Sequence, residues 1–304
     1  MTPNEIAGLI CSKLEESGYR ARVLPIERVA QLKHEIEDGL SQGRIDAGLY
    51  EKYLTYFRFD VAASLPGARS IIITAAPQPQ RKAAFHSNGH TYSGIIPPTY
   101  YHDTDNSIRE TLQNILSSSG YQLHPVVLPV KLLAVRSGMA EYGKNNITYA
   151  EGLGSFMRLR AFLSDMPASR SDWLEPQVMQ ECGSCKACVK ACPTKAIVPD
   201  QFFIHAERCL TFFNEDTEEF PQWIDPAWHN SLIGCMKCQL ICPVNKRFVK
   251  WVEEGETFDE AETDLILNEV PLDRLPPETA HKLNRSYMVE YLDVLPRNLR
   301  ALMK

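Results

Sequence analysis

The sequence of 304 residues has no long apolar run, no excess of basic residues and no glycine-rich phosphate-binding motif. No stretch approaches the 18 or more apolar residues of a membrane-spanning helix, so we expect no membrane association. The formal net charge is −6, so the chain lacks the net basic footprint of a nucleic-acid-binding protein. Neither G-x-G-x-x-G nor a P-loop occurs, and no nicotinamide, flavin or nucleotide site is predicted.

The chain begins Met-Thr-Pro-Asn-Glu, without the basic region and apolar stretch of a secretory signal peptide. We therefore expect a cytoplasmic protein, whose thiols stay reduced. Reduced thiols matter here because eight of the nine cysteines fall in two ordered sets. The ninth, Cys11, lies in a predicted N-terminal helix, and we interpret it as a buried or idle thiol.

The two cysteine sets both end in Cys-Pro, and the first has the spacing C-x2-C-x2-C-x3-C-P. This is the bacterial ferredoxin spacing for [4Fe–4S] clusters, in which the fourth cysteine of a run binds the cluster of the other run. Two clusters and an electron-transfer role are therefore predicted. The rule assigns four ligands to cluster 1, namely Cys182, Cys185, Cys188 and Cys242. It assigns the other four to cluster 2, namely Cys192, Cys209, Cys235 and Cys238.

Zinc and disulfides are the alternative uses of such cysteines. Paired C-x2-C units can hold structural zinc, but zinc does not account for a four-cysteine run or for both Cys-Pro endings. A disulfide framework requires an exported chain, which the N-terminus does not predict. The spacing thus favours iron–sulfur clusters over both.

The predicted fold class is α+β, and the length suggests about two domains beyond a short tail. We expect a mixed sheet flanked by helices in residues 1–175. A ferredoxin-like double-cluster domain follows in residues 176–250, and an acidic, helical C-terminal extension in residues 251–304. The extension carries twelve acidic residues against six Lys and Arg, and we interpret its acidic run as a solvated face.

The hydrophobic patterns predict the main elements of the first domain. Helices are expected at residues 4–18, 27–40, 106–118 and 131–136. Strands are expected within residues 65–77, after the Pro66-Gly67 turn, and at residues 124–130 and 156–163, the first of them buried on both faces. Residues 78–100 are predicted to form a loop, and residues 167–176 a linker. Asp105 is predicted to cap a helix. His205 and His229 are expected to have structural roles.

Four segments besides the cysteines together resemble the epoxyqueuosine reductases, which are cobalamin-dependent double-cluster enzymes of tRNA queuosine synthesis. They are LPGARSII from Leu65, RSG from Arg136, YGKN from Tyr142 and GSF from Gly154. The resemblance runs from about residue 10 to residue 250. It implies that the N-terminal domain binds cobalamin and that the clusters reduce the corrinoid, which then acts on a substrate.

The resemblance also implies candidate site residues. Those near cobalamin would be Arg136, Gly143, Lys144, Asn145 and Ser155. The family has an acid in a V-D-x-x-P context, but the corresponding stretch here, residues 126–129, has no carboxylate. Tyr and His can donate protons, so the candidate catalytic residues become Tyr100, Tyr101, His102 and Asp103.

The helical tRNA-binding repeats of long family members are missing, and an acidic segment stands in their place. We therefore expect a small-molecule substrate rather than tRNA. A flavodoxin, a ferredoxin or a similar partner would supply the electrons. Two alternatives stay open: an electron-transfer protein without corrinoid catalysis, and true epoxyqueuosine reduction on tRNA.

Overall fold

The computed structural model describes residues 1–168, 172–199 and 202–304, so part of the expected linker, residues 169–171, lies outside the described residues. Two compact units divide the chain. Unit 1 contains residues 1–77, 102–185 and the described residues of 201–203; unit 2 contains residues 78–101, 186–199 and 204–304. These units do not coincide with the three expected domains, because residues 78–101 pack with the C-terminal third of the chain.

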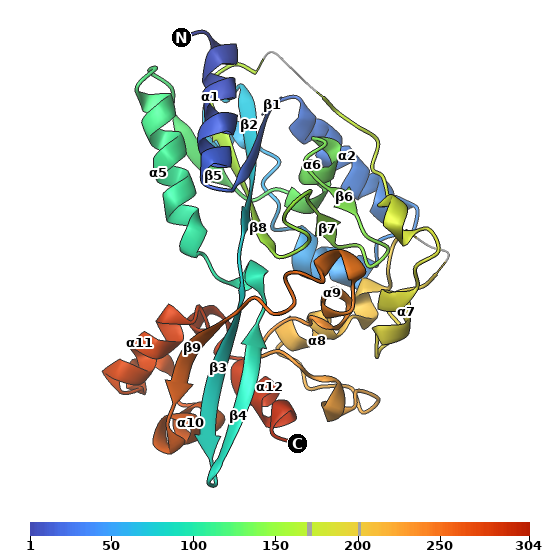
Figure 1. Cartoon of the computed structure of the whole chain (residues 1–304), viewed down its shortest axis with the longest axis vertical. Coiled ribbons are helices and arrows are strands. Elements are labelled where there is room, and N and C mark those ends of the chain that lie inside the picture. The colour runs from blue at the N-terminus through green and yellow to red at the C-terminus, as the bar shows by residue number, and fades with distance from the viewer. Residues whose placement is uncertain (169–171, 200–201) are drawn as a thin grey trace. The chain divides into compact units, whose positions relative to one another are not determined.

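Unit 1 is built on a four-stranded sheet with the order β1-β2-β8-β5 (Figure 1). Every pair of neighbouring strands in it is antiparallel, where a mixed sheet was expected. Its strands, with the small hairpin beside them, are β1 (Arg20–Pro25), β2 (Ser70–Pro77), β5 (Leu123–Val126), β6 (Glu141–Tyr142), β7 (Thr148–Tyr149) and β8 (Met157–Ser164). Its helices are α1 (Pro3–Glu16), α2 (Arg28–Ser41), α3 (Ala47–Leu49), α4 (Val61–Ser64), α5 (Asp103–Ser117) and α6 (Val130–Arg136).

The central strand β2 is buried on both faces, as its β-branched run predicts. Ile72 faces a core shared with α1 and α5, whereas Ile71 and Ile73 face a second core shared with α2 and α6. This alternation follows from the two-residue period of a strand. Helices therefore cover both faces of the sheet, and α1 and α5 lie side by side on one of them (Figure 1).

The expected helices of unit 1 and the strand at 156–163 occur close to their predicted positions. The strand expected within residues 65–77 is β2, which begins at Ser70. The predicted strand at 124–130 is shorter, because α6 begins at Val130. The prediction that Asp105 caps a helix is wrong: α5 begins at Asp103, and His102 occupies the N-cap position.

Unit 2 contains a mixed three-stranded sheet with the order β4-β3-β9, and its strands are β3 (Gln80–Ser87), β4 (His90–Ile96) and β9 (Val252–Phe258). The prediction of a loop over residues 78–100 is therefore wrong. Asn88 and Gly89 both have positive φ, at 51° and 74°, as a tight hairpin turn requires. The helices of this unit are α7 (Ala187–Ala191), α8 (Leu210–Glu215), α9 (Lys237–Leu240), α10 (Glu260–Leu267), α11 (Pro277–Arg285) and α12 (Leu295–Leu302).

The C-terminal segment is part of the core of unit 2. Phe258, Leu283 and Leu299 are buried together with Phe85 of β3, and the Phe85 and Phe258 rings stack 4.8 Å apart. This core joins β9, α10, α11 and α12 to the hairpin (Figure 1). Residues 251–304 thus complete a folded unit around the sheet.

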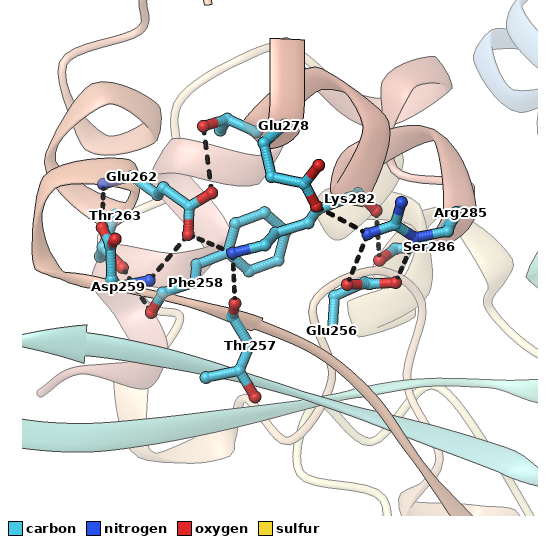
Figure 2. A network of polar contacts seen from close by, with 11 residues as sticks. Glu256, Thr257, Phe258, Asp259, Glu262, Thr263, Glu278, Lys282, Arg285 and Ser286 are labelled. Carbon is cyan, nitrogen blue, oxygen red and sulfur yellow. Dashed lines mark hydrogen bonds and ion pairs between the residues drawn. The ribbon is translucent and has the colours of Figure 1, made fainter. Parts of the chain in front are cut away.

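Most of the acidic run is exposed, as expected, but Glu262 and Glu256 have specific partners. Glu262 is 8 % exposed and contacts Lys282 Nζ at 2.5 Å, and Arg285 pairs with Glu256 at 2.7 Å (Figure 2). Glu262 also completes a capping box with Asp259 at the start of α10. These contacts hold α10, α11 and β9 together. Among the described residues, no helix has both the length and the apolar character to cross a membrane.

Candidate iron–sulfur centre and its surroundings

The four cysteines assigned to cluster 2 gather in unit 2. Cys192 is buried, and Cys209 and Cys238 pack against the same small core around Ala196. Cys235 lies close enough to Cys209 and Cys192 for their charges to act on it, and burial first and these charges next raise its pKa to about 12. A metal binds cysteines as thiolates. A bound metal would therefore stabilise the ionised form of these thiols, which burial disfavours.

Short elements place these ligands. Cys209 is the N-cap residue of α8, Cys238 lies in α9, and Cys192 follows α7 directly. Helices α7 and α9 contact each other, which brings the two cysteine sets together. In residues 1–168, 172–199 and 202–304, no three His, Cys, Asp or Glu side chains stand at single-ion spacing. The cysteines assigned to cluster 2 thus lie near one another. They are not as close together as the ligands of a single metal ion.

The first two ligands assigned to cluster 1 contact the turn between β6 and β7. The backbone N–H of Lys144 donates to Cys182 Sγ at 3.4 Å. The Lys144 ammonium donates to the carbonyl oxygens of Cys185 and Gly183 at 3.3 and 3.5 Å. This turn therefore supports the cysteine loop with one hydrogen bond to sulfur and two to backbone. Lys144, which is also predicted to lie beside cobalamin, therefore contacts two expected cluster ligands.

The other residues expected near cobalamin are engaged within unit 1. Arg136 pairs with Glu35 at 2.9 Å and with Glu175 at 3.0 Å. Asn145 is buried and donates from Nδ2 to the Tyr149 hydroxyl at 2.9 Å. A Cβ on Gly143 would lie 2.6 Å from the Tyr149 ring, so this glycine permits close packing.

Ser155, the fifth of these residues, is buried at 7 % exposure. Arg136, Lys144 and Asn145 thus make polar contacts within the chain, and the role of the set at cobalamin stays a prediction.

The four candidate catalytic residues are divided between the units. Tyr100 and Tyr101 lie in unit 2, and His102 and Asp103 in unit 1. The Tyr101 hydroxyl donates to the carbonyl oxygen of Pro79, and its ring is almost fully buried. The Tyr100 hydroxyl donates to Glu215, and burial followed by this carboxylate raises the pKa of Tyr100 well above its ordinary value. Both hydroxyls are thus committed to hydrogen bonds within the chain, which disfavours them as proton donors.

Asp105 has a different role from the predicted cap. Its carboxylate accepts two hydrogen bonds from Arg158 at 2.8 and 3.1 Å, and Arg160 lies 3.3 Å away. His102 Nδ1 is 3.9 Å from the same carboxylate. Asp105 therefore ties the first turn of α5 to β8. Sequence spacing could not reveal this contact, because the partners are more than 50 residues apart.

A cavity of about 490 Å³ opens elsewhere on unit 1, between α1, β1 and the loop before β8. Cys11 lines it, and its thiol donates to the Ala21 carbonyl at 3.5 Å, while burial raises its pKa. Glu15, Arg22 and Glu151 lie around it. None of the expected site residues lines this cavity.

The family described as "4Fe-4S double cluster binding domain" matches residues 181–245. All eight assigned cysteines lie within the matched range. The chain thus contains a double [4Fe–4S] domain.

Comparison with known proteins supports the resemblance seen in the motifs. An epoxyqueuosine reductase of Gloeobacter violaceus is 27 % identical over 279 residues, which cover 84 % of this chain and 83 % of that protein. A crystal structure of a selenomethionine-labelled epoxyqueuosine reductase matches 99 % of this chain and 82 % of that one, with a TM-score of 0.68 and 22 % identity. An epoxyqueuosine reductase crystallised with an epoxyqueuosine-modified tRNA-Tyr stem loop matches the same shares, with a TM-score of 0.65 and 21 % identity. The resemblance and the α+β fold class are thereby confirmed, and the chain is an iron–sulfur oxidoreductase.

Proposed function

We propose that this relative of the epoxyqueuosine reductases is a cobalamin-dependent reductase that draws its electrons from two [4Fe–4S] clusters. The observation that carries the proposal is the gathering of Cys192, Cys209, Cys235 and Cys238 within a double-cluster domain. Cysteine thiolates are the ligands of such clusters. Two clusters can hold two electrons, which is the number that a substrate reduction with two protons consumes.

Cobalamin enters the proposal through the kinship, which covers most of the chain. When bound, a corrinoid supplies a low-valent cobalt as the reducing centre, while the protein provides binding and electrostatics. The five residues expected to hold it stay candidates, and no step is assigned to them. Lys144 also supports the cysteine loop of cluster 1.

His102 and Asp103 are the remaining candidates for the proton donor. His102 is partly exposed and lies beside Asp105, and Asp103 opens α5. Either residue could deliver a proton to a reduced substrate if it reaches the reacting atom. A reductase assay of His102→Gln and Asp103→Asn would show which substitution lowers turnover without loss of iron.

The cofactors can be tested on protein purified without oxygen. We expect about eight iron atoms per chain, as two [4Fe–4S] clusters require, and a corrinoid absorption spectrum after incubation with cobalamin. Zinc in place of iron would contradict the whole proposal. Eight irons without cobalamin uptake would support the alternative of a simple electron-transfer protein. Reduction of the clusters by flavodoxin or ferredoxin would identify the kind of electron donor.

The substrate separates two versions of this function. The net charge of −6 and the acidic C-terminal segment favour a small electrophilic molecule over a polyanion. The names of the relatives favour epoxyqueuosine in tRNA. Turnover of an epoxyqueuosine-containing stem loop, but not of small epoxides, halides or alkenes, would decide for tRNA. We place the protein in the cytoplasm, where its thiols stay reduced.

A further inference from the structure

The two segments that carry Cys209 and Cys235 are joined by a buried amide. Asn214 lies in α8, whose N-cap is Cys209. Its Nδ2 donates to the carbonyl oxygen of Gly234 at 2.7 Å, and Gly234 directly precedes Cys235. Asn214 is fully buried, so this bond forms away from water. The contact spans a gap of 25 residues between the two cysteines.

A second buried amide reaches the same two segments from the C-terminal helix. Asn298 of α12 donates from Nδ2 to the carbonyl oxygen of Asn214 at 2.8 Å and to that of Leu232 at 2.9 Å. Its Oδ1 accepts from Arg297 at 3.1 Å, which fixes the orientation of the amide. Asn298 is also fully buried. One side chain therefore satisfies carbonyls on both sides of the gap.

Tyr100 completes the arrangement from the 3-10 turn Pro98–Tyr100, which follows β4. Its hydroxyl donates to Glu215, the last residue of α8, and its ring lies edge-on to Tyr291 with centroids 5.6 Å apart. A Cβ on Gly234 would lie 2.6 Å from the Tyr100 hydroxyl, so the ring packs directly on the residue before Cys235. Gly234 has a φ of 67°, which suits glycine.

These contacts come from parts of the chain outside the cysteine sets. The 3-10 turn after β4 supplies Tyr100, and α12 supplies Asn298, more than 50 residues beyond Cys242. Hydrogen bonds and solvent exposure around the sulfurs set the potential of an iron–sulfur cluster, and outer partners of metal ligands orient them. Groups that fix the segments of Cys209 and Cys235 therefore act on the cluster these cysteines bind.

We infer that Asn298 and Tyr100 are positioning residues for cluster 2, and that they set its reduction potential separately from that of cluster 1. The inference rests on the proposed two-cluster function. Asn298 holds α8 and the Leu232–Gly234 stretch at a fixed separation. Tyr100 contacts the same two segments through Glu215 and Gly234. The C-terminal segment thus has a role in electron transfer through the protein that its acidic composition does not indicate.

The test uses Asn298→Leu, which keeps the size of the side chain but removes both donated hydrogen bonds. Redox titration followed by electron paramagnetic resonance should show one cluster shifted to a more positive potential, because a loosened loop admits water. The shifted cluster should be absent from Cys209→Ala protein, which identifies it as cluster 2. Its iron should pass to a chelator at least about tenfold faster, since two buried hydrogen bonds are lost.

Tyr100→Phe is the second variant, because it removes a single hydroxyl and keeps the ring on Gly234. Glu215 then loses its donor, and its charge should move the potential of cluster 2 to a more negative value. Arg300→Gln is the matched control: Arg300 lies on the exposed side of α12 and pairs with Glu269. It should leave both clusters unchanged.

The outcomes separate this inference from the function on which it rests. Wild-type protein without eight irons would contradict the proposed function itself. Eight irons with an unmoved cluster 2 potential in Tyr100→Phe and Asn298→Leu would overturn only the positioning role. Equal shifts of both clusters would also overturn it, because they indicate a general loosening. If Asn298→Leu does not fold, Tyr100→Phe decides alone.

Discussion

His229 is a buried imidazole in a positively charged setting. It is 8 % exposed, and neither ring nitrogen has a hydrogen-bond partner among the described residues. Its ring lies 4.7 Å from that of Phe220, measured between centroids. Burial first, and then the charges of Arg297 and Lys237, lower the pKa of His229 to about 4. The expected structural role is thus an apolar one that depends on a neutral ring.

This environment predicts a defined loss of stability in acid. The unfolded chain protonates His229 near its ordinary pKa of 6.5, whereas the folded chain does so only near 4. Stability is therefore full above pH 6.5 and falls as the pH drops toward 4, by up to about 1.4 kcal/mol per pH unit. In His229→Phe this contribution should vanish, so anaerobic denaturant unfolding at pH 7 and at pH 5 should differ less than in wild type. The same difference in both proteins would contradict the assignment, and exposed His281→Phe should behave as wild type.

At the residue scale, the sequence revealed what depends on spacing and missed what depends on burial. The eight cysteines could be paired into clusters because a cubane needs four thiolates and the run has a known register. The contacts of Asn214, Glu215 and Asn298 could not be predicted, because no sequence pattern shows which polar residues the fold buries. Lys144 was singled out by its motif, and the structure shows contacts with Cys182 and Cys185 that the motif did not indicate.

At the scale of elements, periodicity predicted the buried strand and the amphipathic helices, and it failed at the β3–β4 hairpin. The aromatic and glycine-rich composition of residues 78–100 suggested a loop. Asn88-Gly89, which is a favoured hairpin turn, contained the contrary signal. The burial pattern of β3 is irregular because the strand packs on a core made mostly by residues 258–299, which local sequence does not show.

The β6–β7 turn gives a prediction for cluster 1. Lys144→Met removes the ammonium that donates to Gly183 and Cys185 but keeps the backbone N–H on Cys182. The expected loss of folding stability is about 1 kcal/mol, because both hydrogen bonds of the ammonium are long and partly exposed. The potential of cluster 1 should become more negative with the loss of a nearby positive charge, as redox titration can measure. Lys33→Met removes the same charge from an exposed site of α2, outside the cysteine sets, and is the control.

The same variant distinguishes the two roles considered for Lys144. If it serves the cysteine loop, cobalamin affinity measured by calorimetry stays at the wild-type value while the cluster 1 potential shifts. A weaker cobalamin affinity with an unchanged cluster would instead restore the role that the family motif implies.

At the scale of the whole molecule, the two cysteine sets are interlocked in sequence. In the assignment that the spacing predicts, cluster 1 takes its fourth ligand from the second set, and cluster 2 takes one from the first. Each cluster would then close a loop of about 50 residues, and loss of either should destabilise the fold as well as electron transfer. The compact units do not follow chain order for a related reason: residues 78–101 precede the cysteine sets but pack with the segment that follows them.

The assignment of ligands crossed between the two cysteine sets makes a prediction that differs from an assignment of each cluster to its own set. Cys242→Ala, a change in the second set, should abolish cluster 1 and leave the four ligands of cluster 2 intact. Iron should fall from about eight to about four per chain, whereas Cys11→Ala should keep all of it. The cluster that remains should still change its potential when Tyr100→Phe is added, because Tyr100 contacts the segments of Cys209 and Cys235. If Tyr100→Phe shifts one cluster in the otherwise wild-type chain but does not shift the cluster that remains in Cys242→Ala, each set binds its own cluster and the crossed assignment is wrong.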